Sequence, residues 1–196
     1  MSCEGCPSQG KCGKNSETCG IQSNPDNHIK NIITVMSGKG GVGKSTVTVM
    51  LAKAMAKIGL KVGIMDADIT GPSIPRLLAL TNEHAYGNEK KQLLPVESKE
   101  GIKVMSLNFL VQAESDPVIW RGPVIGGVVK QFYTDVVWGD LDVLLIDMPP
   151  GTGDVALTIM QSIPVQGVVM VSTPQPMVSM IVEKACHMCE KMEVKV

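Results

Sequence analysis

A glycine-rich stretch at residues 37–46, Ser-Gly-Lys-Gly-Gly-Val-Gly-Lys-Ser-Thr, constrains the fold of this chain more than any other feature. The apolar, β-branched run that precedes it, 32–36, is typical of a buried strand. Alanine, leucine and lysine residues follow over 47–58 and predict a helix. A strand, a glycine-rich loop and a helix together form the context that the pattern G-x-x-x-x-G-K-[ST] requires. The sequence therefore predicts a phosphate-binding P-loop rather than a glycine turn that matches by chance.

The residue types of this loop suit an anion. Its glycines allow the backbone to fold around a phosphate with several N–H groups pointing inward, where the start of the next helix adds partial positive charge. Gly38, Gly43, Lys44 and Ser45 occupy the defining positions of the pattern. Lys44 supplies a full charge for the β- and γ-phosphates, and the Ser45 hydroxyl is a ligand that Mg²⁺ accepts.

Length and composition limit the remaining possibilities. A chain of 196 residues that is 44% hydrophobic is long enough for one α/β domain with a real core. Its formal charge of −1 does not favour nucleic acid as a partner. We also expect no membrane span, because unbroken apolar stretches are short, and no secretory signal at the N-terminus. These features predict a cytoplasmic protein, in a compartment where clustered cysteines bind metal more often than they form disulfides.

Strands and helices are expected to alternate after the P-loop. The residue patterns predict strands over 61–65, 102–107, 142–147 and 166–171, and helices over 73–80, 126–137, 155–162 and 177–192. Residues 81–101 are polar and turn-rich, which predicts a loop or a hairpin excursion. This alternation is typical of a doubly wound, mostly parallel sheet, so we expect one P-loop domain over 28–196.

Acidic residues follow two of the predicted strands, at the sheet edge where parallel α/β folds bind their ligands. Asp66 and Asp68 come directly after the strand at 61–65, and either could hold Mg²⁺ or orient a water molecule; the alternative is a pair of helix caps or a solvated turn. Asp147 ends an apolar strand in the manner of a Walker B acid and would bind Mg²⁺ through water. Asp154 is expected to cap the helix after the stiff loop 148–154.

The first 27 residues differ from the rest and contain four of the six cysteines, Cys3, Cys6, Cys12 and Cys19, spaced C-x2-C-x5-C-x6-C. This cysteine-rich segment (residues 1–27) carries too little apolar surface to order itself, but thiolates within reach can close around a metal centre. An iron–sulfur cluster, a zinc ion and free or disulfide-forming thiols remain open. Cys186 and Cys189 share a face of the predicted last helix, either as packed cysteines or as a metal contact.

Five stretches, 39–46, 66–73, 120–123, 144–154 and 172–175, resemble the Mrp/ApbC family of ATPases that carry and deliver iron–sulfur clusters. The second loop lysine, Lys39, makes the loop similar to the deviant Walker A motif of the wider MinD/ParA-like class. The resemblance implies ATP hydrolysis in a homodimer and delivery of a cluster, of the 4Fe–4S type, to apo-proteins. It implies nucleotide binding by Gly38, Lys39, Gly40, Gly41, Val42, Gly43, Lys44, Ser45 and Thr46.

The same resemblance implies roles for individual side chains. Lys39 would act across the dimer interface, Lys44 would act on the phosphates, and Asp68 would orient the attacking water. Ser45 and Asp147 would serve Mg²⁺. From the residues alone, the alternative for Lys39 is a solvated loop lysine.

The chain also departs from that family in two places. The family's cytosolic branch has its fourth N-terminal cysteine upstream, whereas Cys19 lies downstream. Members also continue past residue 196 with a strand and a Cys-Pro-x-Cys pair, so we expect a truncated chain in which 193–196 begins a strand. Two other functions stay open: a positioning ATPase that acts on membrane or DNA, and a zinc-stapled nucleotide-binding module.

Overall fold

A computed structural model of the chain describes residues 24–69, 71–90, 92–110 and 122–196, the side chains of 122–125 and 176–179 excepted. Within these residues a six-stranded sheet has the order β3-β4-β2-β5-β1-β6. All neighbouring strands are parallel except β3 and β4. The strands are β1 (His28–Ser37), β2 (Val62–Asp66), β3 (Val96–Glu97), β4 (Lys103–Met105), β5 (Asp140–Asp147) and β6 (Gly167–Val171). The predicted doubly wound, mostly parallel sheet is confirmed.

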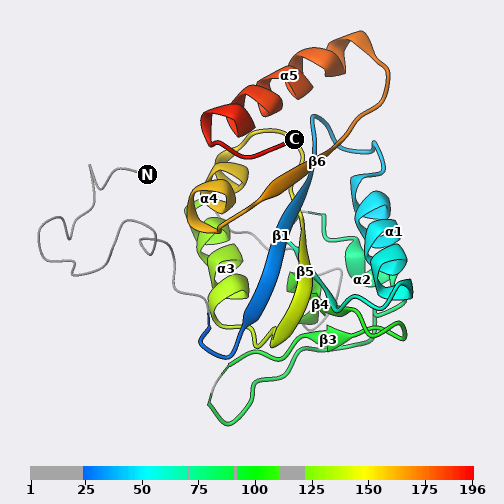
Figure 1. Cartoon of the computed structure of the whole chain (residues 1–196), viewed down its shortest axis with the longest axis vertical. Helices are drawn as coiled ribbons and strands as arrows, with labels where there is room; N and C mark the ends of the chain where they lie inside the picture. The colour runs from blue at the N-terminus through cyan, green and yellow to red at the C-terminus, as the bar shows by residue number, and fades with distance from the viewer. Residues whose placement is uncertain (1–23, 70, 91, 111–121) are drawn as a thin grey trace, which may run out of the picture.

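Helices cover both faces of the sheet (Figure 1). One face carries α1 (Lys44–Lys57) and the single-turn α2 (Ile74–Leu77); the other carries α3 (Gly122–Thr134), α4 (Asp154–Ser162) and α5 (Pro176–Lys191). Each face has its own core. Phe132, Trp138 and Ile159 pack under α3 and α4, and Val49 and Ile74 pack under α1 and α2.

The central strands are buried because each lies between two others and under helices on both faces. The last five residues of β5 are all buried, as is every residue of β2. At Gly63 in β2 a Cβ atom would lie only 2.7 Å from Leu141 Cδ1 and 3.0 Å from Leu144 Cδ1, so any side chain here would have to displace core side chains. Because β1 and β2 both pair parallel with β5, the carboxyl ends of these three strands meet at one edge.

Several predicted elements have different bounds in the structure; β1, for example, begins at His28 rather than at residue 32. The helix expected over 73–80 is only one turn long, and Ala79 already has a left-handed backbone (φ 56°). The strand expected over 102–107 ends at Met105 and continues as a 3₁₀ turn, η2 (Leu107–Phe109). The helix expected over 126–137 begins at Gly122 and ends at Thr134.

Two other local predictions have clear outcomes. Asp154 does not cap α4. Gly153 occupies the N-cap position, so no side chain caps this helix, and Asp154 is the first helical residue. Residues 81–101 form the hairpin excursion rather than a plain loop, because β3 pairs antiparallel with β4. Two-residue strands are too short for periodicity to indicate.

The ends of the described chain both contact the sheet. Before β1, Asn24 is buried, and Asn27 Nδ2 donates a hydrogen bond to the Val136 carbonyl oxygen (2.9 Å). At the other end, the Val168 N–H donates to the Lys195 carbonyl oxygen (2.8 Å), which forms a parallel bridge beside β6. The prediction that 193–196 begins a strand is therefore confirmed for this one bridge.

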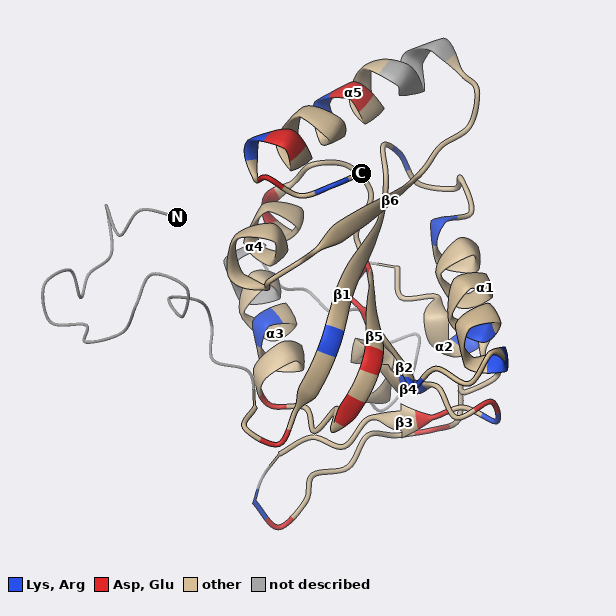
Figure 2. Cartoon of the chain, viewed as in Figure 1, with Lys and Arg blue, Asp and Glu red and all other residues tan. Residues whose placement is uncertain are grey.

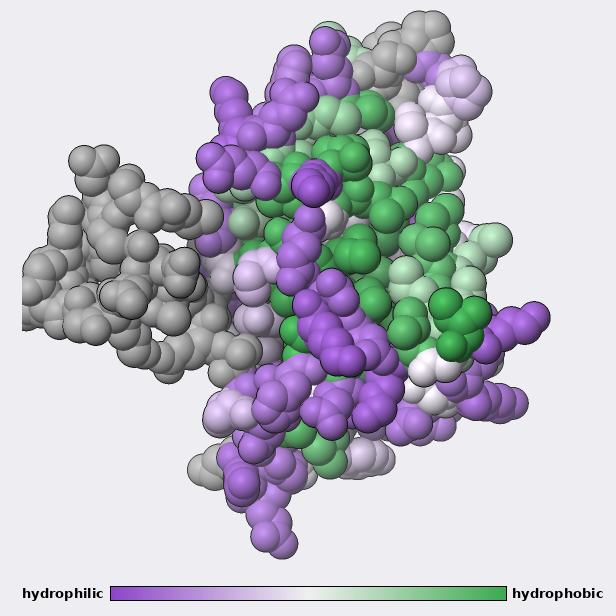
Figure 3. Space-filling view, in the orientation of Figure 1, coloured by the Kyte–Doolittle hydropathy of each residue, from purple (hydrophilic) through white to green (hydrophobic). Residues whose placement is uncertain are grey.

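Apolar residues reach the surface on the face between α1 and α5, where Figure 3 shows a continuous green area. Met50 and Ile58 of the α1 region and Met180 of α5 are among the large apolar side chains that are more than half exposed. None of the helices in the described part of the chain has the length and apolarity needed to cross a bilayer.

Candidate nucleotide site

The P-loop lies between the end of β1 at Ser37 and the start of α1 at Lys44. Gly41 and Gly43 have positive φ angles of 77° and 89°, which other residue types adopt only with strain. Gly43 is the N-cap of α1, and no side chain caps this helix start. The unpaired N–H groups of the first turn therefore remain available to an anion, as the sequence pattern predicts.

A cavity of about 330 Å³ opens over this loop. Its lining combines the P-loop with residues from the β2–α2 connection and the loop after β5: Ser37, Gly40, Gly41, Gly43, Lys44, Ser45, Thr46, Asp68, Gly71, Ser73, Arg76, Leu77 and Pro150. Ser73, Arg76 and Leu77 were not predicted as site residues from the sequence. The signal that could have found them is their position directly after Asp68, at the edge where ligands bind.

Lys44 is buried and lies at the centre of an acidic cluster. Its Nζ atom donates a hydrogen bond to Asp147 Oδ2 (2.9 Å) and lies 3.6 Å from Asp68 Oδ2. Only 7% of the lysine side chain is exposed, so water screens these charges poorly. The structure thus brings together the P-loop lysine and both acids that the resemblance assigned to catalysis and to Mg²⁺.

Asp147 is fully buried at the end of β5 and accepts hydrogen bonds from two hydroxyls of α1. Ser45 Oγ donates to Asp147 Oδ2 (2.6 Å), and Thr48 Oγ1 donates to Asp147 Oδ1 (2.8 Å). A hydroxyl and a carboxylate at this spacing are the oxygen donors that Mg²⁺ prefers, so the residues present fit the ion. Thr48 was not predicted, although its position one helical turn after Lys44 places both on one face of α1.

Asp66 and Asp68 leave β2 in different environments. Asp66 is opposite Asp147 in the strand register and is 1% exposed. It accepts hydrogen bonds from the Asp68 N–H (3.2 Å) and from Ser106 Oγ (3.1 Å). Burial, and secondly the nearby Asp147 charge, raise the pKa of Asp66 to about 8. Asp66 is therefore not part of a solvated turn, and Asp68 is the one of the pair that lines the cavity.

The raised pKa of Asp66 predicts a pH-dependent stability in the absence of nucleotide and Mg²⁺. Between about pH 4 and pH 8 the folded carboxyl keeps a proton that the unfolded chain has released, so stability falls as pH rises. Asp66→Asn cannot titrate, and it should unfold at higher urea than the parent at pH 8. From pH 5 to pH 8 we expect the parent protein to lose about 1–3 kcal/mol more of its free energy of unfolding than the Asp66→Asn variant loses. Parallel stability curves for the two proteins would contradict this prediction.

Lys39 is half-buried and contacts the Gln175 side-chain oxygen, in the segment that follows β6. The two residues are 136 positions apart, so the sequence alone gave no indication of this contact. Lys39 thus connects the P-loop with the segment 172–175, and both stretches carried the family resemblance. Its action across a dimer interface stays a prediction.

The predicted cysteine ligands Cys3, Cys6, Cys12 and Cys19 lie outside the described residues, as does the stretch 120–121. Within the described part of the chain, no group of three or more His, Cys, Asp or Glu residues is arranged to hold a metal ion. Cys189 is buried in the core under α4 and α5, and burial raises its thiol pKa. Cys186 is half-buried and its thiol is free, so the packed interpretation of this pair fits the structure.

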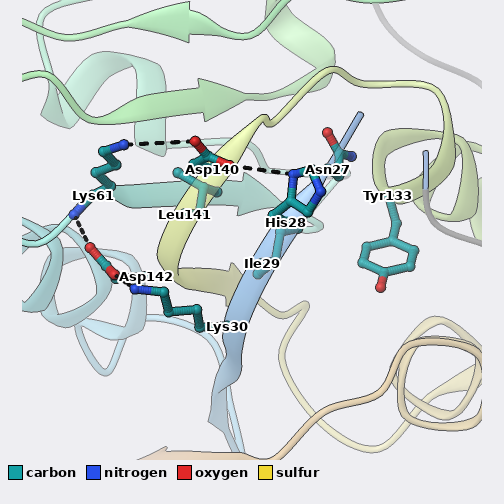
Figure 4. Close-up of a pocket in the computed structure, with 9 residues that line it drawn as sticks. All are labelled: Asn27, His28, Ile29, Lys30, Lys61, Tyr133, Asp140, Leu141 and Asp142. Atoms are coloured by element: carbon teal, nitrogen blue, oxygen red, sulfur yellow. Dashed lines mark hydrogen bonds and ion pairs between the residues drawn. The ribbon is translucent and has the colours of Figure 1, made fainter. Parts of the chain in front are cut away.

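A second cavity, of about 560 Å³, lies at the opposite, amino-terminal edge of the sheet (Figure 4). Its charged groups pair with one another: His28 Nδ1 and Lys61 Nζ with Asp140 (3.3 and 3.9 Å), and Lys30 Nζ with Asp142 Oδ1 (2.7 Å). Figure 2 shows the last of these pairs as a blue band on β1 facing a red band on β5. Because these charges neutralise one another, we assign no ligand to this cavity.

Fold and site together define the chain as a P-loop NTPase. The family model ParA, described as NUBPL iron-transfer P-loop NTPase, matches residues 28–196. The chain therefore belongs to this family of iron-transfer P-loop NTPases, and the resemblance inferred from the sequence is confirmed.

Individual relatives agree with this assignment. The chain is 50% identical to an iron–sulfur cluster carrier protein of Clostridium perfringens, covering 98% of this chain and 72% of the relative. It is 45% identical to one of Methanocaldococcus jannaschii, covering 99% and 68%. A solved structure of a nucleotide-binding protein in complex with ADP, from Archaeoglobus fulgidus, is 48% identical with a TM-score of 0.74. That comparison covers 86% of this chain and 64% of the other, so the chain spans less than two thirds of the solved relative.

Proposed function

We propose that this protein hydrolyses ATP and uses the cycle to carry an iron–sulfur cluster to apo-proteins in the cytoplasm. The observation that carries the proposal is the match over residues 28–196 to an iron-transfer NTPase family, joined to a P-loop with its lysine and acids in place. Relatives at 45–50% identity are iron–sulfur cluster carrier proteins.

The nucleotide chemistry follows from the site. The amides of the P-loop and Lys44 bind the phosphates. Ser45 and Asp147 would hold Mg²⁺, which would supply positive charge to neutralise the phosphates. Asp68, in the same cavity and 3.6 Å from Lys44 Nζ, orients the attacking water. Lys39 of a second copy stabilises the charge that develops on the transferred phosphoryl group. The active protein is then a homodimer.

The cluster is the cargo in this proposal, and the cysteine-rich segment is its site. Cys3, Cys6, Cys12 and Cys19 would supply four thiolates, the usual ligand set of a 4Fe–4S cluster. Nucleotide state would change the dimer arrangement and, through it, the affinity for the cluster. Apo iron–sulfur proteins are the recipients.

Anaerobic reconstitution with iron and sulfide tests the cluster site. We expect the parent chain to hold iron and acid-labile sulfide in equal amounts, with the visible absorption of a cluster. A variant with Cys3, Cys6, Cys12 and Cys19 replaced by serine should hold neither, because thiolates are the ligands. The matched control is the Cys186→Ala, Cys189→Ala variant, which should reconstitute as the parent does.

Two outcomes of that experiment would overturn the assignment. A cluster that survives in the four-serine variant would show that other residues bind it. Zinc in the purified parent, together with no uptake of iron and sulfide, would leave a zinc-stapled nucleotide-binding module. Binding of ATP measured on the same samples keeps the nucleotide assignment separate from the cluster assignment.

A further inference from the structure

We propose that Asp66 and Ser106 are positioning residues for nucleotide hydrolysis, which hold Asp68 in place beside Lys44. The inference rests on the proposed function, in which Asp68 orients the attacking water. Neither Asp66 nor Ser106 lines the cavity over the P-loop, so both act through Asp68 rather than on the nucleotide.

The first contact fixes the backbone where the chain leaves β2. Asp66 Oδ1 accepts a hydrogen bond from the Asp68 N–H (3.2 Å), a side-chain-to-backbone contact two residues apart of the kind that forms an Asx-turn. The Ala67 N–H donates to the Asp147 carbonyl oxygen (2.9 Å), which continues the β2–β5 ladder by one residue. The turn therefore spans Asp66 to Asp68, and at its end Asp68 Oδ2 lies 3.6 Å from Lys44 Nζ.

The second contact fixes the Asp66 side chain itself. Ser106 Oγ donates to Asp66 Oδ2 (3.1 Å), and both residues are buried, at 0% and 1% exposure. Ser106 directly follows β4, whose Met105 is paired with Met65 of β2. The pairing of these two strands therefore places the Ser106 hydroxyl next to Asp66. With one oxygen held by Ser106 and the other by the turn, the Asp66 carboxyl has a single orientation.

The segment after β4 supports the same connection at a second point. Asn108 Nδ2, in η2, donates to the Pro72 carbonyl oxygen (3.4 Å), just before α2. Residues 106–108 thus contact the chain on both sides of Asp68. This arrangement limits how far Asp68 can move from the cavity.

The burial of Asp66 argues for a role beyond stability. A carboxyl group inside the protein, close to the second carboxylate of Asp147, costs free energy that an apolar side chain would not. The compensating hydrogen bonds are the two that orient Asp68's backbone and Asp66 itself. Because the Asp66 carboxyl is costly to bury and holds the turn that carries Asp68, we expect it to contribute to the function of the nucleotide site.

The test measures steady-state ATP turnover of the full chain in variants that remove one contact each. We expect Ser106→Ala to lower kcat about three- to tenfold at unchanged KM, which is the effect of one lost hydrogen bond. Asp66→Ala should lower kcat further, and Asp66→Asn, which keeps an acceptor for the Asp68 N–H, should recover most of that loss. The matched control is Ser98→Ala, another buried serine with hydrogen bonds, located in the β3–β4 turn. It should change thermal stability without changing kcat.

A double-mutant cycle shows whether the effect passes through Asp68. In an Asp68→Asn background, followed by single-turnover hydrolysis, Ser106→Ala should cause no further loss. An equal loss in both backgrounds, or a kcat for Ser106→Ala that matches Ser98→Ala, would overturn the inference while leaving the proposed function intact. If Asp68→Asn itself hydrolyses ATP at the parent rate, the role of Asp68 in the proposed function fails, and this inference fails with it.

Discussion

Replacing Lys44 by alanine is expected to lower ATP turnover by a factor on the order of 10²–10³ and to destabilise the protein even without nucleotide. The first effect follows because the ammonium group is the full positive charge that the loop offers to the phosphates. The second follows because Lys44 Nζ pairs with Asp147, which is fully buried. Without the lysine, the buried carboxylate would keep, among the described residues, the hydroxyl donors of Ser45 and Thr48, and its burial would cost about 3–5 kcal/mol.

Urea unfolding and ATP-binding calorimetry separate the two effects. Lys57→Ala is the control, because Lys57 is an exposed lysine in the last turn of the same helix. Adding Asp147→Asn to Lys44→Ala should recover much of the stability but none of the turnover, since it removes the unpaired charge without restoring the lysine. A Lys44→Ala protein that binds and hydrolyses ATP like the parent would contradict the P-loop assignment.

Lys39→Ala is expected to abolish most hydrolysis while leaving ATP binding close to the parent value. A cation supplied by a partner subunit stabilises only the transition state, and such groups contribute about 10³–10⁵ in rate in related chemistry. Because Lys39 also contacts Gln175 within its own chain, loss of activity alone would not distinguish action in cis from action in trans. A mixing experiment makes that distinction.

The mixture combines Lys39→Ala with Asp68→Asn, two variants that should each be nearly inactive. In a mixed dimer, the Lys39→Ala subunit keeps its own Asp68 and receives Lys39 from its partner, so one site becomes complete. We expect turnover to rise well above the sum of the separate variants. A mixture that shows only this sum would place Lys39 in its own subunit's site or outside catalysis.

The site residues that could be predicted from the sequence are those that belong to a local sequence pattern. The P-loop, with Lys44 and Ser45, is a local pattern between a strand and a helix. Asp147 was found because an apolar strand ends in an acid, and in a parallel sheet strand ends meet at one edge. Their mutual contacts, such as the 2.9 Å bond from Lys44 to Asp147, confirm that reasoning.

The parts that were missed depend on contacts between residues far apart in the sequence. Ser106 lies 40 positions from Asp66, and a serine after a short strand carries no signal of its own. The helix after Asp68 was predicted too long because its composition continues to favour helix, whereas the chain turns at Ala79 with φ 56°. Local propensity does not contain the tertiary packing that decides such positions.

The strand order has a consequence for how the protein folds. Strand β1 pairs with β5, and the contact between Lys30 and Asp142 closes a loop of 112 residues. Such long-range pairing forms slowly, because closing the loop lowers the conformational entropy of the chain before the stabilising contacts have formed. Only a chain that has joined β1 to β5 brings Lys44 and Asp147 together, so the complete nucleotide site forms only after this pairing. We therefore expect a bound nucleotide to slow unfolding of the folded protein more than it speeds folding.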